Sequence, residues 1–154
     1  MMRKIGTTIY HISAGGYILH EGKILMIKNF YHGGIVPPHG HVEKGESNLD
    51  AAKREICEET GYCDLRVILK LGKAEYQYIS GNTKNKKTEH RWLFELKTDQ
   101  RKPKLDNKES EQLQNRWYTI DGAIRAASFK NSKNDLQKIK RYLAHHHHTK
   151  TVEK

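Results

Sequence analysis

The pattern of hydrophobic and polar positions predicts a β-hairpin near the start of the chain. Residues 9–19 form an apolar, β-prone segment with small residues at 14–16. Small residues in a strand let a backbone or a ligand approach closely. A polar turn at 20–22 leads into a short apolar run at 24–27. Two β-prone runs joined by a turn predict a hairpin.

Helix signals mark one central segment. Ser47, with Asp50 three residues later, has the pattern of an N-cap with an acidic partner, and Gly61 suits the position after the last turn. These signals predict a helix from about 48 to 60. Its apolar residues recur at helical spacing and are expected to face the core: Leu49, Ala52 and Ile56.

The chain after this helix carries further β-prone runs. They predict strands at 65–71, 74–79, 91–97 and 116–120. The segment 80–88 is polar, and we expect it to be a turn that joins the second and third of these strands.

Two helices are expected to close the chain. Asp121 can cap a short helix through Ala127, and Ser132, with Asp135 three residues later, can start the last helix. The apolar face of the last helix consists of Leu136, Ile139 and Leu143. Strands, one central helix, more strands and a final helix predict an α/β (α+β) fold with a mixed sheet between helices.

Length and charge bound the class of protein. A chain of 154 residues fits one domain, which we place at 1–144. The remaining residues, 145–154, contain His145 to His148 and are expected to form a flexible tail. A formal net charge of +10 favours anionic partners such as nucleotides and polyphosphates, although a solvated basic face explains part of this charge.

Cysteine content and hydropathy help to predict the cellular compartment of the protein. The chain has two cysteines, Cys57 and Cys63, and no apolar run approaches the ~20 residues of a membrane span. The basic start is not followed by the apolar stretch of a signal peptide. We therefore expect a reduced, cytoplasmic protein without a membrane partner, in which Cys57 is a packing residue and no disulfide forms.

Glu55, Glu58 and Glu59 crowd one flank of the predicted helix. At about 100° per residue, they fall within an arc of roughly 100°. Like charges at i and i+4 destabilise an isolated helix by a few tenths of a kcal/mol. A solvated acidic face is one interpretation of this cluster, and a bound cation is the other.

The residues around the cluster favour the cation. The run GHVEKGESNLDAAKREICEETGY has Gly40, Glu46, Arg54 and the glutamates at the spacing of the Nudix box, so the chain resembles the Nudix family. Tyr62 stands where an aliphatic residue is usual. The resemblance implies an α/β/α sandwich and a hydrolase that attacks a phosphorus of a nucleoside diphosphate linked to another group. It also implies a Mg²⁺ cofactor, with Mn²⁺ possible, because hard cations prefer oxygen ligands.

The resemblance also implies roles for individual residues. The implied metal ligands are Glu55, Glu58, Glu59 and the carbonyl of Gly40. Arg54 and Glu46 would orient these carboxylates, because the planar guanidinium holds a carboxylate in two directions. Glu58 or Glu111 is the expected general base.

Flanking segments bear on the substrate. PPHGHVEKGE resembles the PPKGHVEPGE of asymmetrical diadenosine tetraphosphate hydrolases, with His39 where lysine is usual, and RWLFELK resembles their YWLAEVK. This resemblance implies an adenine ring held between Tyr78 and Tyr142, although both tyrosines could simply pack. His41 and Lys87 are further candidate substrate contacts.

The sequence is compatible with three functions. The first is hydrolysis of dinucleoside tetraphosphates, that is, an asymmetrical bis(5′-nucleosyl)-tetraphosphatase. The second is a pyrophosphatase for another substrate, such as a nucleoside triphosphate, ADP-ribose, a diphosphoinositol phosphate or an RNA 5′ end. The third is a binding module without turnover, which the intact Arg54 and glutamate set disfavours. A nucleic-acid-binding domain is disfavoured because no recognised aromatic motif accompanies the basic residues.

Overall fold

The computed structural model describes residues 1–30, 33–101 and 113–152, with side chains up to residue 146. The elements are strands β1 (Met2–Ile5), β2 (Thr8–His20), β3 (Lys23–Asn29), β4 (Ile35–Val36), β5 (His39–His41), β6 (Leu65–Ser80), β7 (Thr83–Leu96) and β8 (Leu113–Thr119), and helices α1 (Asn48–Thr60), α3 (Ile120–Ala126) and α4 (Lys130–Val152).

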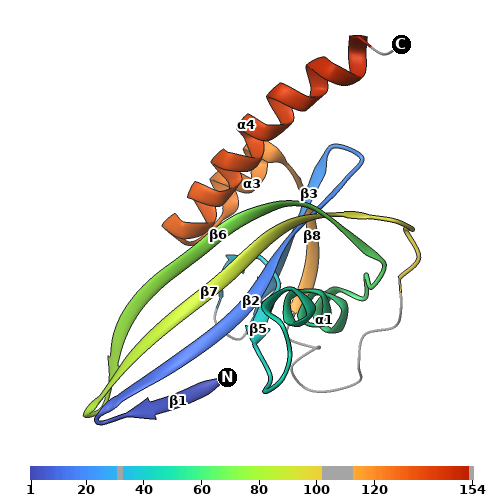
Figure 1. Ribbon diagram of the computed structural model, residues 1–154. Helices are drawn as coiled ribbons and strands as arrows, with labels where there is room; N and C mark the ends of the chain where they lie inside the picture. Colours follow the sequence, from blue (N-terminus) through green and yellow to red (C-terminus); the bar gives the residue numbers. More distant parts are fainter. Residues whose placement is uncertain (31–32, 102–112, 153–154) are drawn as a thin grey trace.

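Strand β2 is the centre of a mixed sheet (Figure 1). Along one edge it pairs in parallel with β7, from Thr8 with Lys84 to Leu19 with Glu95. Along the other edge it pairs antiparallel with β1, then β5, then β3. Strand β6 adds to β7 as a long antiparallel hairpin, and β8 adds to β3. The predicted first hairpin is confirmed as β2 and β3.

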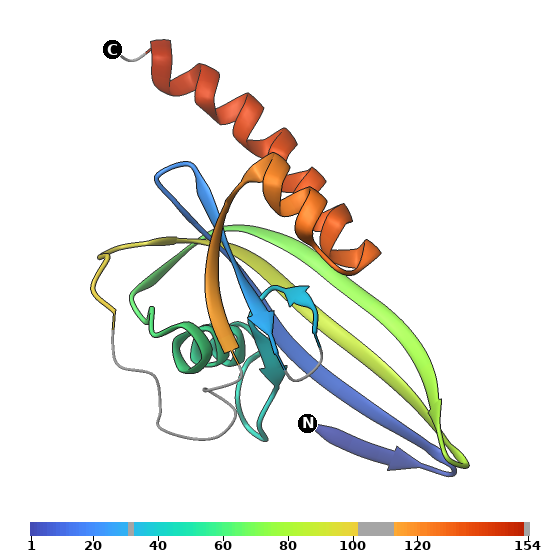
Figure 2. The same ribbon diagram turned by 180° about the vertical axis from the view of Figure 1, so that it is seen from behind.

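Successive residues of these strands face opposite sides of the sheet, and each side has its own core. Ala14 and Ile18 of β2 pack in the cluster that includes Ile56 of α1. Tyr17 of β2 packs in the cluster that includes Leu136 of α4, together with residues of α3. Figures 1 and 2 show α1 on one side of the sheet and α3 with α4 on the other. The predicted α/β/α sandwich is therefore confirmed.

Helix α1 matches its prediction at both ends. The Oγ of Ser47 accepts a hydrogen bond from the backbone N–H of Asp50 at 3.0 Å. Gly61 has a φ of 85°, and its N–H donates to the carbonyl of Cys57 at 2.9 Å. A left-handed residue after the last turn is the conformation in which glycine is least strained.

The prediction for the long hairpin is wrong in two places. Residues 65–80 form one strand, which accommodates the expected break as an irregularity beside Gly72. The expected turn at 80–88 is confined to Gly81 and Asn82, and β7 begins at Thr83. Polar residues 84–88 continue the strand because their backbone pairs with β2 on one side and with β6 on the other.

The helices after β8 begin at residues other than those predicted. Thr119, and not Asp121, caps α3, since its Oγ1 accepts from the N–H of Gly122 at 3.1 Å. Asp121 pairs instead with Lys140 at 2.8 Å. Helix α4 begins at Lys130, before Ser132, and it continues past Leu143 through the histidine tract to Val152. No helix of the described ranges, α4 included, is long and apolar enough to cross a membrane.

Asp135 does not cap α4 but lies buried in the protein. It accepts two hydrogen bonds from Arg91 of β7 and one from the hydroxyl of Tyr17. The side chains of Arg91 and Asp135 are 6% and 1% exposed. This ion pair fastens the first turns of α4 to the sheet.

The two cysteines form a disulfide, so the expectation of reduced cysteines is wrong. Cys57 lies in the last turn of α1, and the left-handed turn at Gly61 reverses the chain. Cys63 thereby returns to a Cα–Cα distance of 4.4 Å from Cys57, within the range that a disulfide spans. Composition and compartment do not describe this reversal of the chain, which is what brings the two cysteines together.

Candidate active site

Two glycines allow close backbone contacts around the segment between β4 and α1. Gly15 lets this segment lie directly on β2, and Gly40 lets it lie directly on α1. A Cβ on Gly15 would come within 2.2 Å of the carbonyl oxygen of Pro38, and the N–H of Gly16 donates to the same oxygen at 3.1 Å. Gly40 approaches α1 as closely, because a Cβ there would lie 2.1 Å from Cδ of Glu55. Only glycine fits at this contact, which places the loop backbone against a carboxylate.

Arg54 organises the acidic cluster. Its Nε and Nη2 donate to the two carboxylate oxygens of Glu46 at 2.8 and 3.0 Å. Its Nη1 donates to Glu55 at 2.8 Å and to Glu58 at 3.3 Å, and Nη2 also donates to the carbonyl of His41 at 2.9 Å. The hydrogen bonds from Arg54 lower the pKa of Glu46. The same contacts raise the pKa of Arg54, with the bond to Glu46 as the main cause.

The three helix glutamates differ in environment. Glu55 is 14% exposed, and burial raises its pKa in spite of the bond to Arg54. Glu58 is 40% exposed. Glu59 accepts a hydrogen bond from the backbone N–H of His39 at 3.2 Å, so it faces the loop. One flank of α1 thus offers carboxylates in different surroundings.

These residues fit a divalent cation by ligand type. The carboxylates near Arg54 outnumber its single positive charge, and the pKa of the buried Glu55 is already raised, so a cation would offset an uncompensated negative charge. All of the candidate ligands are hard oxygen donors. In the structure the carboxylates turn towards Arg54, and no three His, Cys, Asp or Glu side chains of the described residues converge on one point as a metal site.

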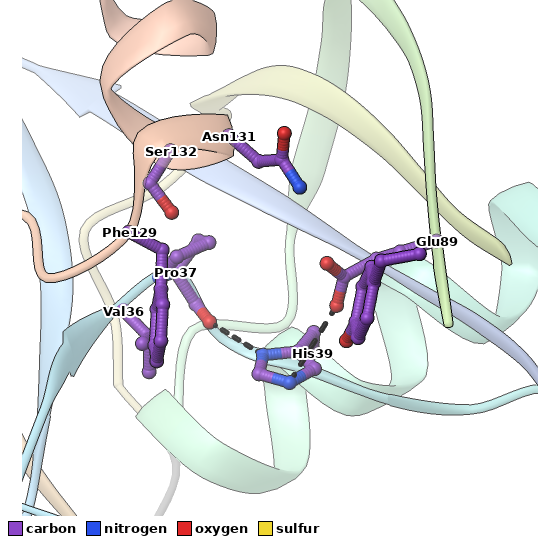
Figure 3. Close-up of a pocket in the computed structure, with 8 residues that line it drawn as sticks. Val36, Pro37, His39, Glu89, Phe129, Asn131 and Ser132 are labelled. Carbon is purple, nitrogen blue, oxygen red and sulfur yellow. Dashed lines mark hydrogen bonds and ion pairs between the residues drawn. The ribbon is translucent and has the colours of Figure 1, made fainter. Parts of the chain in front are cut away.

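A pocket of about 320 Å³ opens on the other side of the loop (Figure 3). Its lining includes Tyr76, Glu89, Phe129, Asn131 and Ser132, together with the ring of His39. Its volume is in the range of small-molecule sites.

His39 connects this pocket to the carboxylates. Its backbone N–H binds Glu59, whereas its ring lies in the pocket, with Nδ1 2.9 Å from the carbonyl oxygen of Pro37. Nε2 of the same ring lies 3.5 Å from Oε1 of Glu89. One residue of the loop therefore contacts both the acidic helix and the pocket.

Three of the predicted substrate residues lie on the same face of the sheet. The ring of His11 stacks with His41 at 5.9 Å and with Tyr78 at 6.1 Å. Lys87 places its Nζ 5.8 Å from the ring centroid of Tyr76. Burial, with the nearby charge of Lys87 contributing, lowers the pKa of His41.

Tyr142 is not brought to this face. Its ring stacks on His146 at 3.8 Å, and it packs against the core beneath α4. In Figure 1 the C-terminal half of α4 and the tip of the β6–β7 hairpin extend towards opposite ends of the molecule. Tyr78 lies near that tip, where it pairs with Asn85. The remaining predicted residue, the candidate base Glu111, lies outside the described residues.

Glu89 and Phe129 are among the pocket residues that were not predicted from the sequence. Glu89 falls next to the segment that we assigned to a turn, and extending the strand pattern through Lys87, Glu89 and Arg91 would have placed it on one face. Phe129 precedes α4 and is 60% exposed. An exposed aromatic residue just before an amphipathic helix was the available signal for it.

The fold and the site define a Nudix-type hydrolase. The family model of the NUDIX domain matches residues 9–142. The chain belongs to the Nudix family, and it is a pyrophosphohydrolase as its homologues are. Hydrolases of this family generally use divalent metal ions and act on small nucleotide substrates. The resemblance stated from the sequence is thereby confirmed, and the binding module without turnover is not supported.

The known proteins that this chain resembles differ in their activities. The chain is 35% identical over 108 residues to the asymmetrical bis(5′-nucleosyl)-tetraphosphatase of Rattus norvegicus, and the match covers 70% of each chain. It is 39% identical over 93 residues to a probable DHNTP pyrophosphohydrolase of Lactococcus lactis, covering 55% of this chain and 54% of the other. In structure, a C. elegans Ap4A hydrolase in a binary complex superposes with a TM-score of 0.68 at 24% identity, covering 87% of this chain and 98% of that one.

Proposed function

We propose that this protein is an asymmetrical bis(5′-nucleosyl)-tetraphosphatase, which splits a dinucleoside tetraphosphate into a nucleoside triphosphate and a nucleoside monophosphate. The observation that carries the proposal is the double contact of His39, whose backbone binds the acidic helix and whose ring lines the pocket. A base in the pocket would have its phosphates directed across the loop to the carboxylates. The 35% identity to the rat tetraphosphatase supports the same substrate class.

The acidic flank of α1 would hold the cofactor, which we propose to be Mg²⁺, with Mn²⁺ as a substitute. The proposed ligands are Glu55, Glu58, Glu59 and the carbonyl of Gly40. A bound divalent cation supplies Lewis-acid stabilisation of the negative charge on the phosphoryl oxygens. Arg54 has a positioning role, since its bonds to Glu46 and Glu55 keep these carboxylates in place before substrate arrives.

Glu58 is the proposed general base among the described residues. Its side chain is 40% exposed, against 14% for Glu55, and both of its oxygens lie 3.3 Å from Nη1 of Arg54. Its carboxylate can therefore reach a water molecule on the solvent side of the cluster and accept its proton. Glu111 stays the alternative base.

We propose that Tyr76 and Phe129 bind the base, in place of the pair Tyr78 and Tyr142 that the resemblance implies. Tyr76 and Phe129 both line the pocket and are 38% and 60% exposed. Stacking of a base on an aromatic ring contributes about 1–3 kcal/mol. Lys87, beside Tyr76, supplies positive charge for the polyphosphate. Tyr142 has no part in this arrangement.

A substrate panel with product identification tests the proposal. Initial rates with Mg²⁺ are compared for dinucleoside tetraphosphates, ADP-ribose, nucleoside triphosphates and dihydroneopterin triphosphate, and products are separated by ion-exchange chromatography. We expect a dinucleoside tetraphosphate to be among the substrates with the highest kcat/KM and to yield a triphosphate and a monophosphate. Two diphosphates as products, or tetraphosphates among the poorest substrates, would contradict the proposal.

Dihydroneopterin triphosphate is the second candidate substrate. Two observations favour it: the 39% identity to the Lactococcus protein, and a TM-score of 0.65 at 20% identity to the E. coli dihydroneopterin triphosphate pyrophosphohydrolase, covering 84% of this chain and 95% of that one. The same panel separates the two candidates.

A further inference from the structure

Glu89 brings a carboxylate into the pocket. It lies on β7 two residues after Lys87, so both project from the same face of the sheet, as does Tyr76, which pairs with Lys87. The side chain of Glu89 is 13% exposed. In Figure 3 one of its oxygens points to the ring of His39 and the other into the pocket, on the side of Asn131. A molecule that fills the pocket therefore meets this carboxylate.

The protein leaves this carboxylate short of hydrogen-bond donors. Oε1 of Glu89 is buried and has no hydrogen-bond partner among the described residues. His39 Nε2 lies 3.5 Å away, which is longer than an N–H···O hydrogen bond. Nδ1 of that ring donates to the carbonyl oxygen of Pro37, which can only accept. A buried acceptor without a donor destabilises the site, so a ligand whose N–H groups draw this carboxylate towards the pocket would remove that cost.

The position of Glu89 is held from behind by the ion pair that fastens α4. Arg91 donates from Nη1 to the backbone carbonyl of Glu89 at 3.1 Å, while its Nη2 donates to Asp135 at 3.0 Å. Both partners of this ion pair are almost fully buried. The backbone of β7 at Glu89 is thus held at a fixed position relative to the first two turns of α4.

We propose that Glu89 determines base specificity by accepting hydrogen bonds from two adjacent N–H groups, as presented by the 2-amino-6-oxopurine edge of guanine. Guanine offers N1–H and the 2-amino group on that edge, and both can donate to one carboxylate. Adenine offers an acceptor at N1, which would face the lone pairs of Glu89. The inference rests on the proposed function for the rest of the substrate, and it replaces an adenine preference with a guanine preference.

The size of the effect follows from paired hydrogen bonds to a base edge. A bidentate contact of this kind discriminates between bases by about 10- to 100-fold. Hypoxanthine keeps N1–H but lacks the 2-amino group, so it is expected to rank between the two. The preferred order of bases is therefore guanine, hypoxanthine, adenine.

The experiment compares kcat/KM for the symmetrical tetraphosphates of guanosine, inosine and adenosine. Wild-type protein is expected to favour guanosine over adenosine by about 10- to 100-fold, with inosine between them. Glu89→Gln replaces one acceptor oxygen with a donor, and we expect it to abolish or reverse this ratio. Each ratio of kcat/KM values is measured on a single protein preparation. A smaller fraction of folded protein lowers both values equally and therefore leaves the ratio unchanged.

Glu95→Gln is the matched control. It makes the same change on the same strand. Glu95 lies outside the pocket and forms an ion pair with Arg66, with an N–O distance of 3.3 Å. The control variant is expected to keep the wild-type ratio. Equal rates for guanosine and adenosine in the wild type, or an unchanged ratio in Glu89→Gln, would overturn the proposal.

A binding measurement separates this inference from the proposed function. Calorimetric titration with GMP and AMP needs no turnover, and we expect tighter binding of GMP to wild type and loss of that preference in Glu89→Gln. If no dinucleoside tetraphosphate is hydrolysed, the proposed function fails, while the two monophosphates still decide the role of Glu89. Equal affinities for GMP and AMP would refute that role even in an active tetraphosphatase.

Discussion

Replacing Asp135 with alanine is expected to lower the unfolding free energy of the protein and to disturb its selection between bases. Asp135 is 1% exposed and accepts hydrogen bonds from Arg91 and from Tyr17. Removing it leaves the guanidinium of Arg91 buried without its counter-charge. Arg91 also holds the carbonyl of Glu89, so the effect should extend to the pocket.

The magnitude follows from the burial of this pair. Breaking a buried ion pair by removing one partner costs about 3–5 kcal/mol of unfolding free energy. For a chain of this size that corresponds to a fall in Tm of about 6–20 °C. Tyr17→Phe removes only one bond to the carboxylate and should cost about 1.5–3 kcal/mol. The double variant Arg91→Met, Asp135→Leu removes both charges and is expected to recover most of the loss.

Urea denaturation followed by circular dichroism measures all three variants against the wild type. A loss below about 1 kcal/mol for Asp135→Ala would refute the reasoning, since that is the magnitude of a solvent-exposed pair. A double variant as unstable as Asp135→Ala would also refute it, because the cost would then come from packing and not from an unpaired charge.

Three further predictions concern the acidic helix. Gly40→Ala places a methyl group 2.1 Å from Cδ of Glu55; we expect a loss of kcat of about 10²-fold or more from the displaced carboxylate, and unchanged kcat would refute the contact. Glu58→Gln should lower kcat by about 10²- to 10⁴-fold with an unchanged unfolding midpoint, and near-wild-type turnover would exclude Glu58 as the base. Reducing the Cys57–Cys63 disulfide should lower the unfolding free energy by about 2 kcal/mol; identical urea curves with and without reductant would argue against it.

Local signals explain which parts of the fold could be predicted. Helix α1 was placed from Ser47 to Gly61 because its cap, its apolar stripe and its terminal glycine all lie within one short segment. The first hairpin was placed for the same reason. Strand β7 was predicted too short, because residues 84–88 are polar and only their pairing with β2 and β6 makes them a strand.

The difference between local signals and long-range contacts also applies to side chains. Asp135 has the spacing of a helix cap, yet it is buried because Arg91, 44 residues away in sequence, offers two hydrogen bonds. The resemblance implies a base-stacking role for Tyr142, and in the structure its ring stacks on His146 and packs against the core beneath α4. Neither partner can be identified from the sequence near the residue itself.

The spacing from Gly40 to Gly61 was enough to predict Arg54 and the glutamates on one flank of a capped helix, because helical periodicity is a local property. The surroundings of that helix depend on contacts between distant parts of the chain. The pocket combines residues of β6, β7, the loop before α1 and the start of α4. Such residues meet through strand pairing and helix packing over long separations, and no local pattern encodes those contacts.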